Sequence, residues 1–504
     1  MNKCCRLRKS RNSWKQKAVN RANTIREMRK KVKVMQKRVI DCAAAMQDKL
    51  TSLEENNETI ESSCKNNNNV NVERLQEADF VRILCVLLVI KATLPFRAVP
   101  RILFLFCSLG IFSNIWIPHF TSIINWTLRL GIAKLQDITP LLEPWVAILD
   151  CSINIGIYKA LVVLRVPLLA LKKKGGAVGL EDCECIGIDI EHSWTGPSVK
   201  TAIKSIFEKA GKPQAILKDK GADLKKGVVL WHQDQDGEKI WTIDDIGHEV
   251  ANALKAEYAK TNNFQEFIKI IHKGAARIRQ TTLAYVLPPK IRTKGRFQGI
   301  TRVAKWSSEI LDLIGGRGRA KADSNIGKLR SAFSGLRKLC PFLKKFISTC
   351  MVVSEFQKLL KNKGLNQATY EKAIQIIEFL PYRSKVRIRL KNWLVQALQI
   401  QCRLNIGQTP LIVSSDVIES LFGKFKVMIQ RNPMAELNRL VYAIPLLCGN
   451  TSIEVLDSSL KGVSHTKLQK KLENEVPKTL RSSRREFLNR HHKGGTKNRE
   501  HGED

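Results

Sequence analysis

The stretch "WVAILDCSINIGIYKALVVLRV", residues 145–166, has the pattern of two β-strands divided by "NIG" at 154–156. A third β-rich run, "CECIGIDIEHSW" (183–194), follows the turn-like "KKKGGAVGLED". Consecutive strands joined by short turns favour an antiparallel meander. Asp150 closes the first, otherwise apolar run, and a carboxylate in such a strand is costly unless a metal or hydrogen bonds compensate it.

A helix and two further strands follow this meander. "GPSVKTAIKSIFEKAG" (196–211) carries apolar residues at helical spacing and stops at a glycine. "QAILKD" (214–219) predicts a fourth strand ending in Asp219, and "KIWTIDD" (239–245) a fifth. Three strands, a helix and two more strands predict an α/β core with a mixed sheet.

Charge is the strongest feature of the composition. Among 504 residues there are 85 Lys and Arg against 46 Asp and Glu, a net charge of +39. Such a surface attracts polyanions, so nucleic acid is the first candidate partner, with an anionic membrane surface or a merely solvated basic surface as alternatives. The thirteen cysteines show neither a disulfide framework nor zinc spacing, and the polar N-terminus does not resemble a secretory signal. We therefore expect a cytoplasmic protein.

One apolar region imitates a membrane span. Residues 102–128 carry no formal charge, but polar side chains and Pro118 interrupt them, and the mostly apolar part ends at 117. This is shorter than the roughly 20 residues that a span needs, so buried helices are expected and no membrane partner.

Composition and periodicity divide the chain into six expected segments. They are 1–75, a basic helix or coiled coil with an Asn-rich linker; 76–140, a helical domain resembling a helix-turn-helix; 141–250, the first part of the α/β core; 251–407, an all-α insertion; 408–455, the final part of the core; and 456–504, a basic flexible tail.

Two of these segments have a DNA-binding and a neutral interpretation. The basic helix could follow a DNA backbone or simply be solvated. The helix after Pro118, capped by Thr121 or Ser122, could be a recognition helix with Arg129 and Lys134 as DNA contacts. Three packed helices without DNA would show the same pattern.

The stretch "VSSDVIESLFGKFK" (413–426) begins a late amphipathic helix that carries Glu419. With Asp150 and Asp219, this residue completes a possible cluster of carboxylates, the oxygen ligands that Mg²⁺ prefers. Two such ions about 3.5–4 Å apart can assist an in-line phosphodiester displacement. Each residue also has a neutral interpretation: Asp416 and Glu419 as a capping box, Asp219 as a turn residue, Asp150 on a solvent face.

Residues one to two turns after Glu419 on this helix could admit or bind a phosphate. Gly423 leaves room above Glu419, because it follows one helical turn later. Lys424 and Lys426 could then reach phosphate, although solvated charge is the alternative for both. "GGRGRA" (315–320) lacks the Lys-Ser/Thr ending of a phosphate-binding P-loop, so no nucleotide site is assigned there.

The order of these elements resembles the catalytic domain of DDE transposases of bacterial insertion sequences, which have a ribonuclease H-like fold. "AILDCSINIGIYKALVVLRV", "AILKDKGADLKKG" and "SSDVIESLFGKFK" match the motifs that carry the two aspartates and the glutamate, and the gap from 219 to 419 looks like the helical insertion of hAT-type enzymes. The family pattern departs at Asp219, which has a lysine on each side.

This resemblance implies a mechanism and partners. Asp150, Asp219 and Glu419 would hold two Mg²⁺ ions, or Mn²⁺ as a substitute, for cleavage at element ends and strand transfer into target DNA. Asp189 is a rival ligand, and Asp223 and His248 are second candidates beside the site. Double-stranded DNA, a homo-oligomer that pairs ends and association with the nucleoid are implied too. A ribonuclease H-like nuclease without strand transfer and a non-catalytic DNA-binding protein remain alternatives.

Overall fold

The computed structural model describes residues 77–112, 115–151, 158–174, 177–235, 240–292, 295–315, 320–429, 438–476, 478 and 482–489. Contacts divide the chain between residues 75 and 76. The basic helix or coiled coil expected over 1–75 lies outside the described residues.

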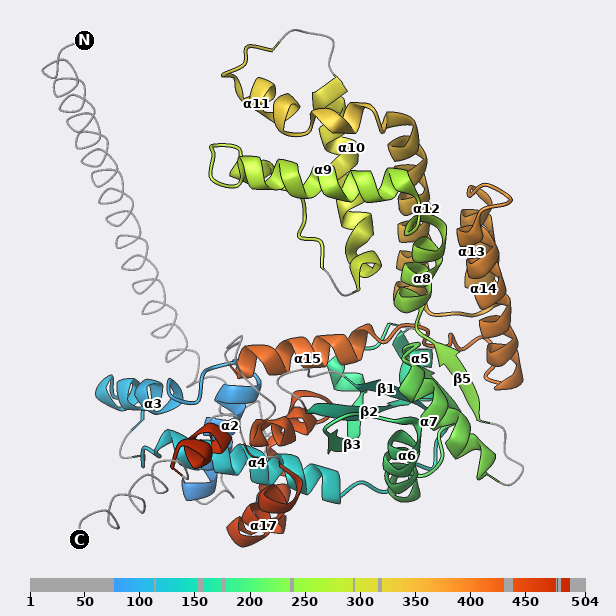
Figure 1. Cartoon of the computed structure of the whole chain (residues 1–504). Coiled ribbons are helices and arrows are strands. Elements are labelled where there is room, and N and C mark those ends of the chain that lie inside the picture. The colour runs from blue at the N-terminus through green and yellow to red at the C-terminus, as the bar shows by residue number, and fades with distance from the viewer. Residues whose placement is uncertain are drawn as a thin grey trace, which may run out of the picture. The chain divides into compact units, whose positions relative to one another are not determined.

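The described part contains a five-stranded mixed sheet (Figure 1). Its strands are β1 Trp145–Cys151, β2 Lys159–Pro167, β3 Glu184–Glu191, β4 Ala215–Lys218 and β5 Trp241–Asp244, in the order β3-β2-β1-β4-β5. β1, β2 and β3 pair antiparallel, whereas β4 is parallel to β1 and β5 to β4. The mixed sheet and the antiparallel meander predicted from the sequence are both present.

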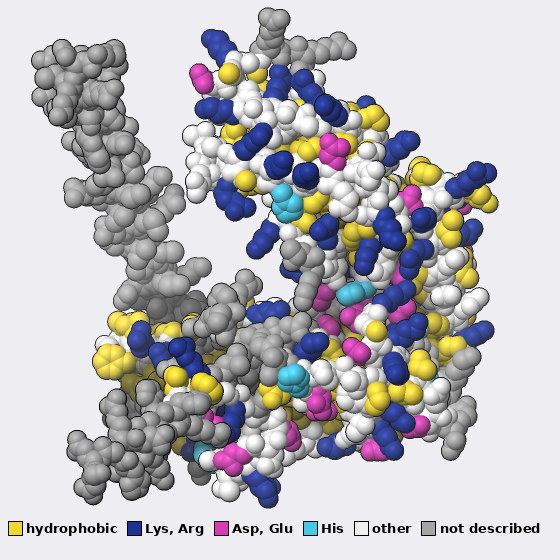
Figure 2. Space-filling model, viewed as in Figure 1, with side chains coloured by type: hydrophobic (Ala, Val, Ile, Leu, Met, Phe, Trp, Pro, Cys, Tyr) yellow, Lys and Arg dark blue, Asp and Glu magenta, His cyan; other side chains and the backbone are white. Residues whose placement is uncertain are grey.

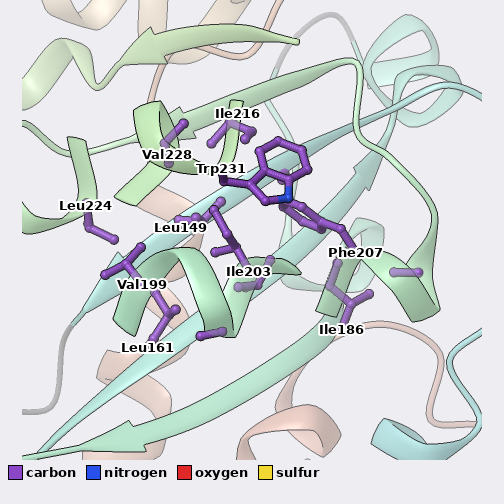
Figure 3. Packing of buried hydrophobic residues seen from close by; sticks show 14 of the residues in the cluster. Leu149, Leu161, Ile186, Val199, Ile203, Phe207, Ile216, Leu224, Val228 and Trp231 are labelled. Carbon is purple, nitrogen blue, oxygen red and sulfur yellow. The ribbon is translucent and has the colours of Figure 1, made fainter. Parts of the chain in front are cut away.

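One face of the sheet packs against α6 (Gly196–Ala210) and α7 (Ala222–Gln233). Figure 3 shows Leu149 from the sheet near Ile203 and Trp231 of the helices, and Leu161 beside Val199. α6 ends where predicted, because Gly211 has a φ of +83° that a residue with a side chain rarely adopts. β1 is buried from Trp145 to Leu149, so its apolar run reflects a strand covered on both faces.

Helices that precede the sheet in the sequence pack against helices near the C-terminal end of the described residues. α4 (Phe120–Gln136) lies against η6 (Arg439–Leu447), and η6 also contacts β3 and α15 (Asp416–Met428). α4 begins at Phe120 after His119, earlier than the caps expected at Thr121 or Ser122. The other members of this group are α2 Glu77–Ile90, α3 Val99–Ser108, α16 Ile453–Gly462 and α17 His465–Glu475.

The C-terminal segment differs from the flexible tail expected from residue 456. α16 and α17 are helices, and both pack against α4. The physical reason is apolar burial, since Leu456 and Leu460 are buried one turn apart on α16 and Leu468 is buried on α17.

The region between β5 and α15 is helical throughout, as the periodicity predicts (Figure 1). α8 packs against both α12 and α14. Among the described residues, no helix is long and apolar enough to cross a membrane. The elements of this region are α8 Ile246–Tyr258, α9 Asn262–Ile278, η3 Ala284–Val286, η4 Arg296–Gly299, α10 Ile300–Gly315, α11 Asn325–Ala332, η5 Ser334–Arg337, α12 Cys340–Lys363, α13 Gln367–Glu378 and α14 Lys385–Arg403; the short elements α5 Leu168–Lys174 and η2 Leu180–Asp182 lie between β2 and β3.

Candidate functional site

Asp150 and Asp219 lie at the same edge of the sheet. β1 and β4 are parallel neighbours whose register pairs Leu149 with Lys218, so the next residues along the two strands are the two aspartates. Side chains at matching positions of adjacent parallel strands point to the same face. The fold therefore places these carboxylates side by side, although 69 positions separate them in the chain, as the numbering in the sequence shows.

The two lysines that flank Asp219 both have acidic partners. Lys218 is buried, and its Nζ donates to Asp244 Oδ1 at 2.8 Å. Lys220 Nζ lies 3.4 Å from Asp244 Oδ2 and also pairs with the buried Glu249. Asp219 itself accepts a hydrogen bond of 2.8 Å from the Gly221 N–H, so it serves the turn as well. The lysines, which depart from the family pattern, thus anchor the segment that presents Asp219.

Glu419 projects from the first turn of α15, where its side chain is exposed. The capping-box interpretation does not hold, because Ser415 is the N-cap residue and makes no side-chain cap. Asp416 is the first helical residue and pairs instead with Lys361, with 2.5 Å between Oδ1 and Nζ. A Cβ added to Gly423 would meet no atom of the described residues within 4 Å, so the space expected there is open.

Asp245 connects β5 to the segment before α15, and sequence reasoning did not single it out. It is buried and caps α8, accepting 2.8 Å from the His248 N–H at Oδ1. Its Oδ2 accepts from the N–H and the Oγ of Ser415, at 2.7 and 2.9 Å. The sequence signal was an aspartate just before an amphipathic helix, which predicts the cap but not the partner 170 residues away.

Electrostatics couple the three predicted carboxylates. Burial, followed by the negative charges of Asp219, Glu419 and Asp245, raises the pKa of Asp150 to about 7. The pKa of Glu419 is also raised, first by partial desolvation, since this exposed residue lines a cavity, and then by Asp416 and Asp245. Three carboxylates, from the end of β4, the start of α8 and α15, therefore act on Asp150 of β1.

The secondary candidates lie in different places. His248 lines the same cavity as Glu419, and its charge opposes the rise in the Glu419 pKa. Asp223 is exposed in the first turn of α7. Asp189 pairs with Leu161 on the face that packs under α6, whereas Asp150 pairs with Val162 on the other face. The role of Asp189 as a rival ligand gains no support from this register.

The predicted DNA contacts on α4 have internal partners. Arg129 donates to the backbone carbonyls of Val463 and Leu460, at 2.5 and 2.8 Å, and Lys134 to that of Cys448 at 2.7 Å. A cation held by backbone carbonyls is not free for phosphate, so these contacts do not favour a recognition helix. On α15, Lys424 is half-buried and its pKa is lowered by burial and by Lys91, whereas Lys426 is exposed.

The donor chemistry at this edge fits a hard divalent cation. The negative charges of Asp219, Glu419 and Asp245 help to raise the pKa of Asp150, and a bound cation would offset that repulsion. As they stand, no three His, Cys, Asp or Glu side chains of the described residues converge closely enough to hold a metal ion. The predicted magnesium ligands thus stay a prediction.

No family model matches the sequence, and no curated protein matches it. Among solved structures, the strand transfer complex of the Drosophila P element transposase matches with a TM-score of 0.39 and 11% identity, over 82% of this chain and 100% of that chain. This likeness is weak, and we draw neither fold nor function from it.

Proposed function

We propose that the chain is a DNA transposase with a ribonuclease H-like core, in which Asp150, Asp219 and Glu419 hold divalent cations. The observation that carries the proposal is the arrangement of these carboxylates: two lie on adjacent ends of parallel strands, and the third comes from a late helix whose charge acts on Asp150. This is the arrangement that the resemblance to DDE transposases implies. The net charge of +39 suits a DNA substrate.

The residues around the carboxylates would have positioning roles. Lys218 and Lys220 fix the segment that carries Asp219 through Asp244 and Glu249. Asp245 holds the start of the Glu419 helix through Ser415. Divalent cations, when bound, would stabilise the charge that develops on the phosphate during an in-line displacement.

Cleavage of a labelled duplex that carries a candidate element end, taken from the DNA beside the gene, tests the proposal. We expect nicking that requires Mg²⁺ and falls to background in Asp150→Asn and in Glu419→Gln. Asp312→Asn, which removes an exposed carboxylate of α10, is the matched control and should cleave like the parent. Unchanged cleavage in both site variants would overturn the proposal.

Strand transfer separates a transposase from a nuclease of the same fold. When a pre-cleaved end with a free 3′-hydroxyl and a circular target plasmid are supplied, a transposase joins them into a linear or branched product. A protein that cleaves the end but never joins it to the plasmid would be a ribonuclease H-like nuclease.

A further inference from the structure

A cavity of about 190 Å³ lies where the start of α15 faces the segment that leads into α10. Glu419, Asp416 and Asp245 line it on the side of the proposed catalytic carboxylates. The segment between α9 and α10 contributes the cations Lys290, Arg292 and Arg296 to the same cavity, and the first turn of α10 contributes Arg302. Acidic and basic groups thus line one space.

The four cations have no acidic partner within the part of the chain that the structure describes. Lys361, which lines the same cavity, shows the contrast, because its Nζ is paired with Asp416. Unpaired cations gathered around one cavity create a positive potential that attracts an anion. Figure 2 shows further Lys and Arg side chains across the helices of this region.

The fold fixes one part of this cationic segment against α9 and α8. Phe297, next to Arg296, is buried and stacks on Phe264 with 5.1 Å between ring centroids. Gln298 Nε2 lies 3.1 Å from His248 Nε2, in the first turn of α8. Since Asp245 caps the same helix, the cations and the carboxylates share a common support.

We propose that Lys290, Arg292, Arg296 and Arg302 bind the phosphate backbone of a DNA strand whose neighbouring phosphodiester lies at the carboxylates. This inference rests on the proposed function and gives the helical insertion a part in it. Guanidinium groups bind phosphate oxygens in a bidentate manner, and several of them suit consecutive phosphates along a strand. The adjacent carboxylates repel a small free anion. A DNA strand is therefore a better ligand than such an anion, because divalent cations can lie between its next phosphodiester and the carboxylates.

Salt dependence of binding tests the inference without any need for cleavage. The probe is a fluorescent mixed-sequence single strand, bound to the full chain in EDTA across a range of salt concentrations. For Arg292→Gln, Arg296→Gln and Arg302→Gln combined, the slope of log K against log salt should fall by about 2, since each lost contact contributes about 0.7.

A matched variant controls for overall charge. Lys255→Gln, Arg279→Gln and Lys328→Gln combined remove the same charge from exposed positions of the helical region, none of which lines the cavity. The slope of this variant should stay close to that of the parent. Equal slopes for the two triple variants would overturn the inference.

Two further measurements keep the result interpretable. If the triple variant has a lower thermal unfolding midpoint than its control, Arg302→Gln alone is used, with an expected loss of about 0.7 in slope. Inorganic triphosphate is titrated in parallel; triphosphate binding that the cavity variant loses, with an unchanged DNA slope, would assign the cavity to a small polyphosphate instead. These experiments measure binding and not cleavage. Failure of the proposed catalytic function can therefore be told apart from failure of this inference.

Discussion

Asp150 has a pKa of about 7 in the folded chain, against 3.8 for an aspartate in its ordinary surroundings. A carboxyl whose pKa is raised by folding stabilises the protein while it is protonated. That contribution is complete below about pH 4 and is lost as the pH rises towards 7. Above this window, the folded state holds a charge that its neighbours repel.

The first prediction follows from this sign. In EDTA, Asp150→Asn should be more stable than the parent at pH 8 by a few kcal/mol, since each unit of pKa shift corresponds to about 1.4 kcal/mol. The advantage should shrink as the pH falls to 4. Urea unfolding midpoints at both pH values measure it, and an equal advantage at pH 4 and pH 8 would contradict burial and charge repulsion as its cause.

Gly131 gives a second prediction at the scale of one residue. A Cβ at this position of α4 would lie 1.8 Å from the backbone oxygen of Tyr442, so η6 would have to move away. We expect Gly131→Ala to cost about 1–3 kcal/mol of stability, as overpacking does.

The same substitution on another helix supplies the control. Gly423→Ala meets open space among the described residues and should gain up to about 1 kcal/mol from helix propensity. Thermal midpoints of the two variants should therefore move in opposite directions. A stabilised Gly131→Ala protein would show that α4 and η6 are not in close contact.

At the scale of elements, Asp245 joins β5 and α8 to the segment that starts α15. Asp245→Ala removes a helix cap and leaves the buried Ser415 without its two hydrogen bonds, so a loss of about 3 kcal/mol is expected. Thr261→Ala, which removes the cap of α9 and an exposed hydrogen bond to the Tyr258 carbonyl, should cost about 1 kcal/mol. Equal losses in urea unfolding would mean that the Ser415 contacts add nothing.

How far the sequence predicts these elements depends on the range of the interactions that form them. The strands around Asp150, the helix that ends at Gly211 and the helices after residue 246 follow from local periodicity, and the structure has all of them. The partners of Arg129 lie more than 300 residues away. The local sequence does not distinguish an arginine or lysine that donates to backbone carbonyls from one that contacts DNA.

The site follows the same division. Asp150 and Asp219 end apolar strands, so their local pattern is visible, and parallel pairing brings them together. The partners of Lys218 and Lys220 are not visible, because Asp244 and Glu249 belong to elements that only the sheet order brings close. The local sequence around Asp245 predicts a helix cap but not the hydrogen bonds that link this residue to Ser415.

For the whole molecule, the mutually repelling carboxylates around Asp150 at the edge of the sheet predict that divalent cations stabilise the folded chain. If Mg²⁺ binds only the folded chain, a concentration of about 100 times its Kd adds about 2.7 kcal/mol of stability. The thermal midpoint of the parent should rise with MgCl₂ beyond its rise in NaCl of equal ionic strength. Asp150→Asn should lose most of that difference; an undiminished shift in this variant would place the binding site elsewhere.

The carboxylates of the site are drawn from distant parts of one chain, and the helical region from α8 to α14 is synthesised between them. On the ribosome, the sheet with Asp150 and Asp219 emerges long before Glu419 is translated. Any shortened product that stops within the helical region carries both aspartates but lacks the glutamate. A product of premature termination there therefore has the strands of the sheet without the complete set of site carboxylates.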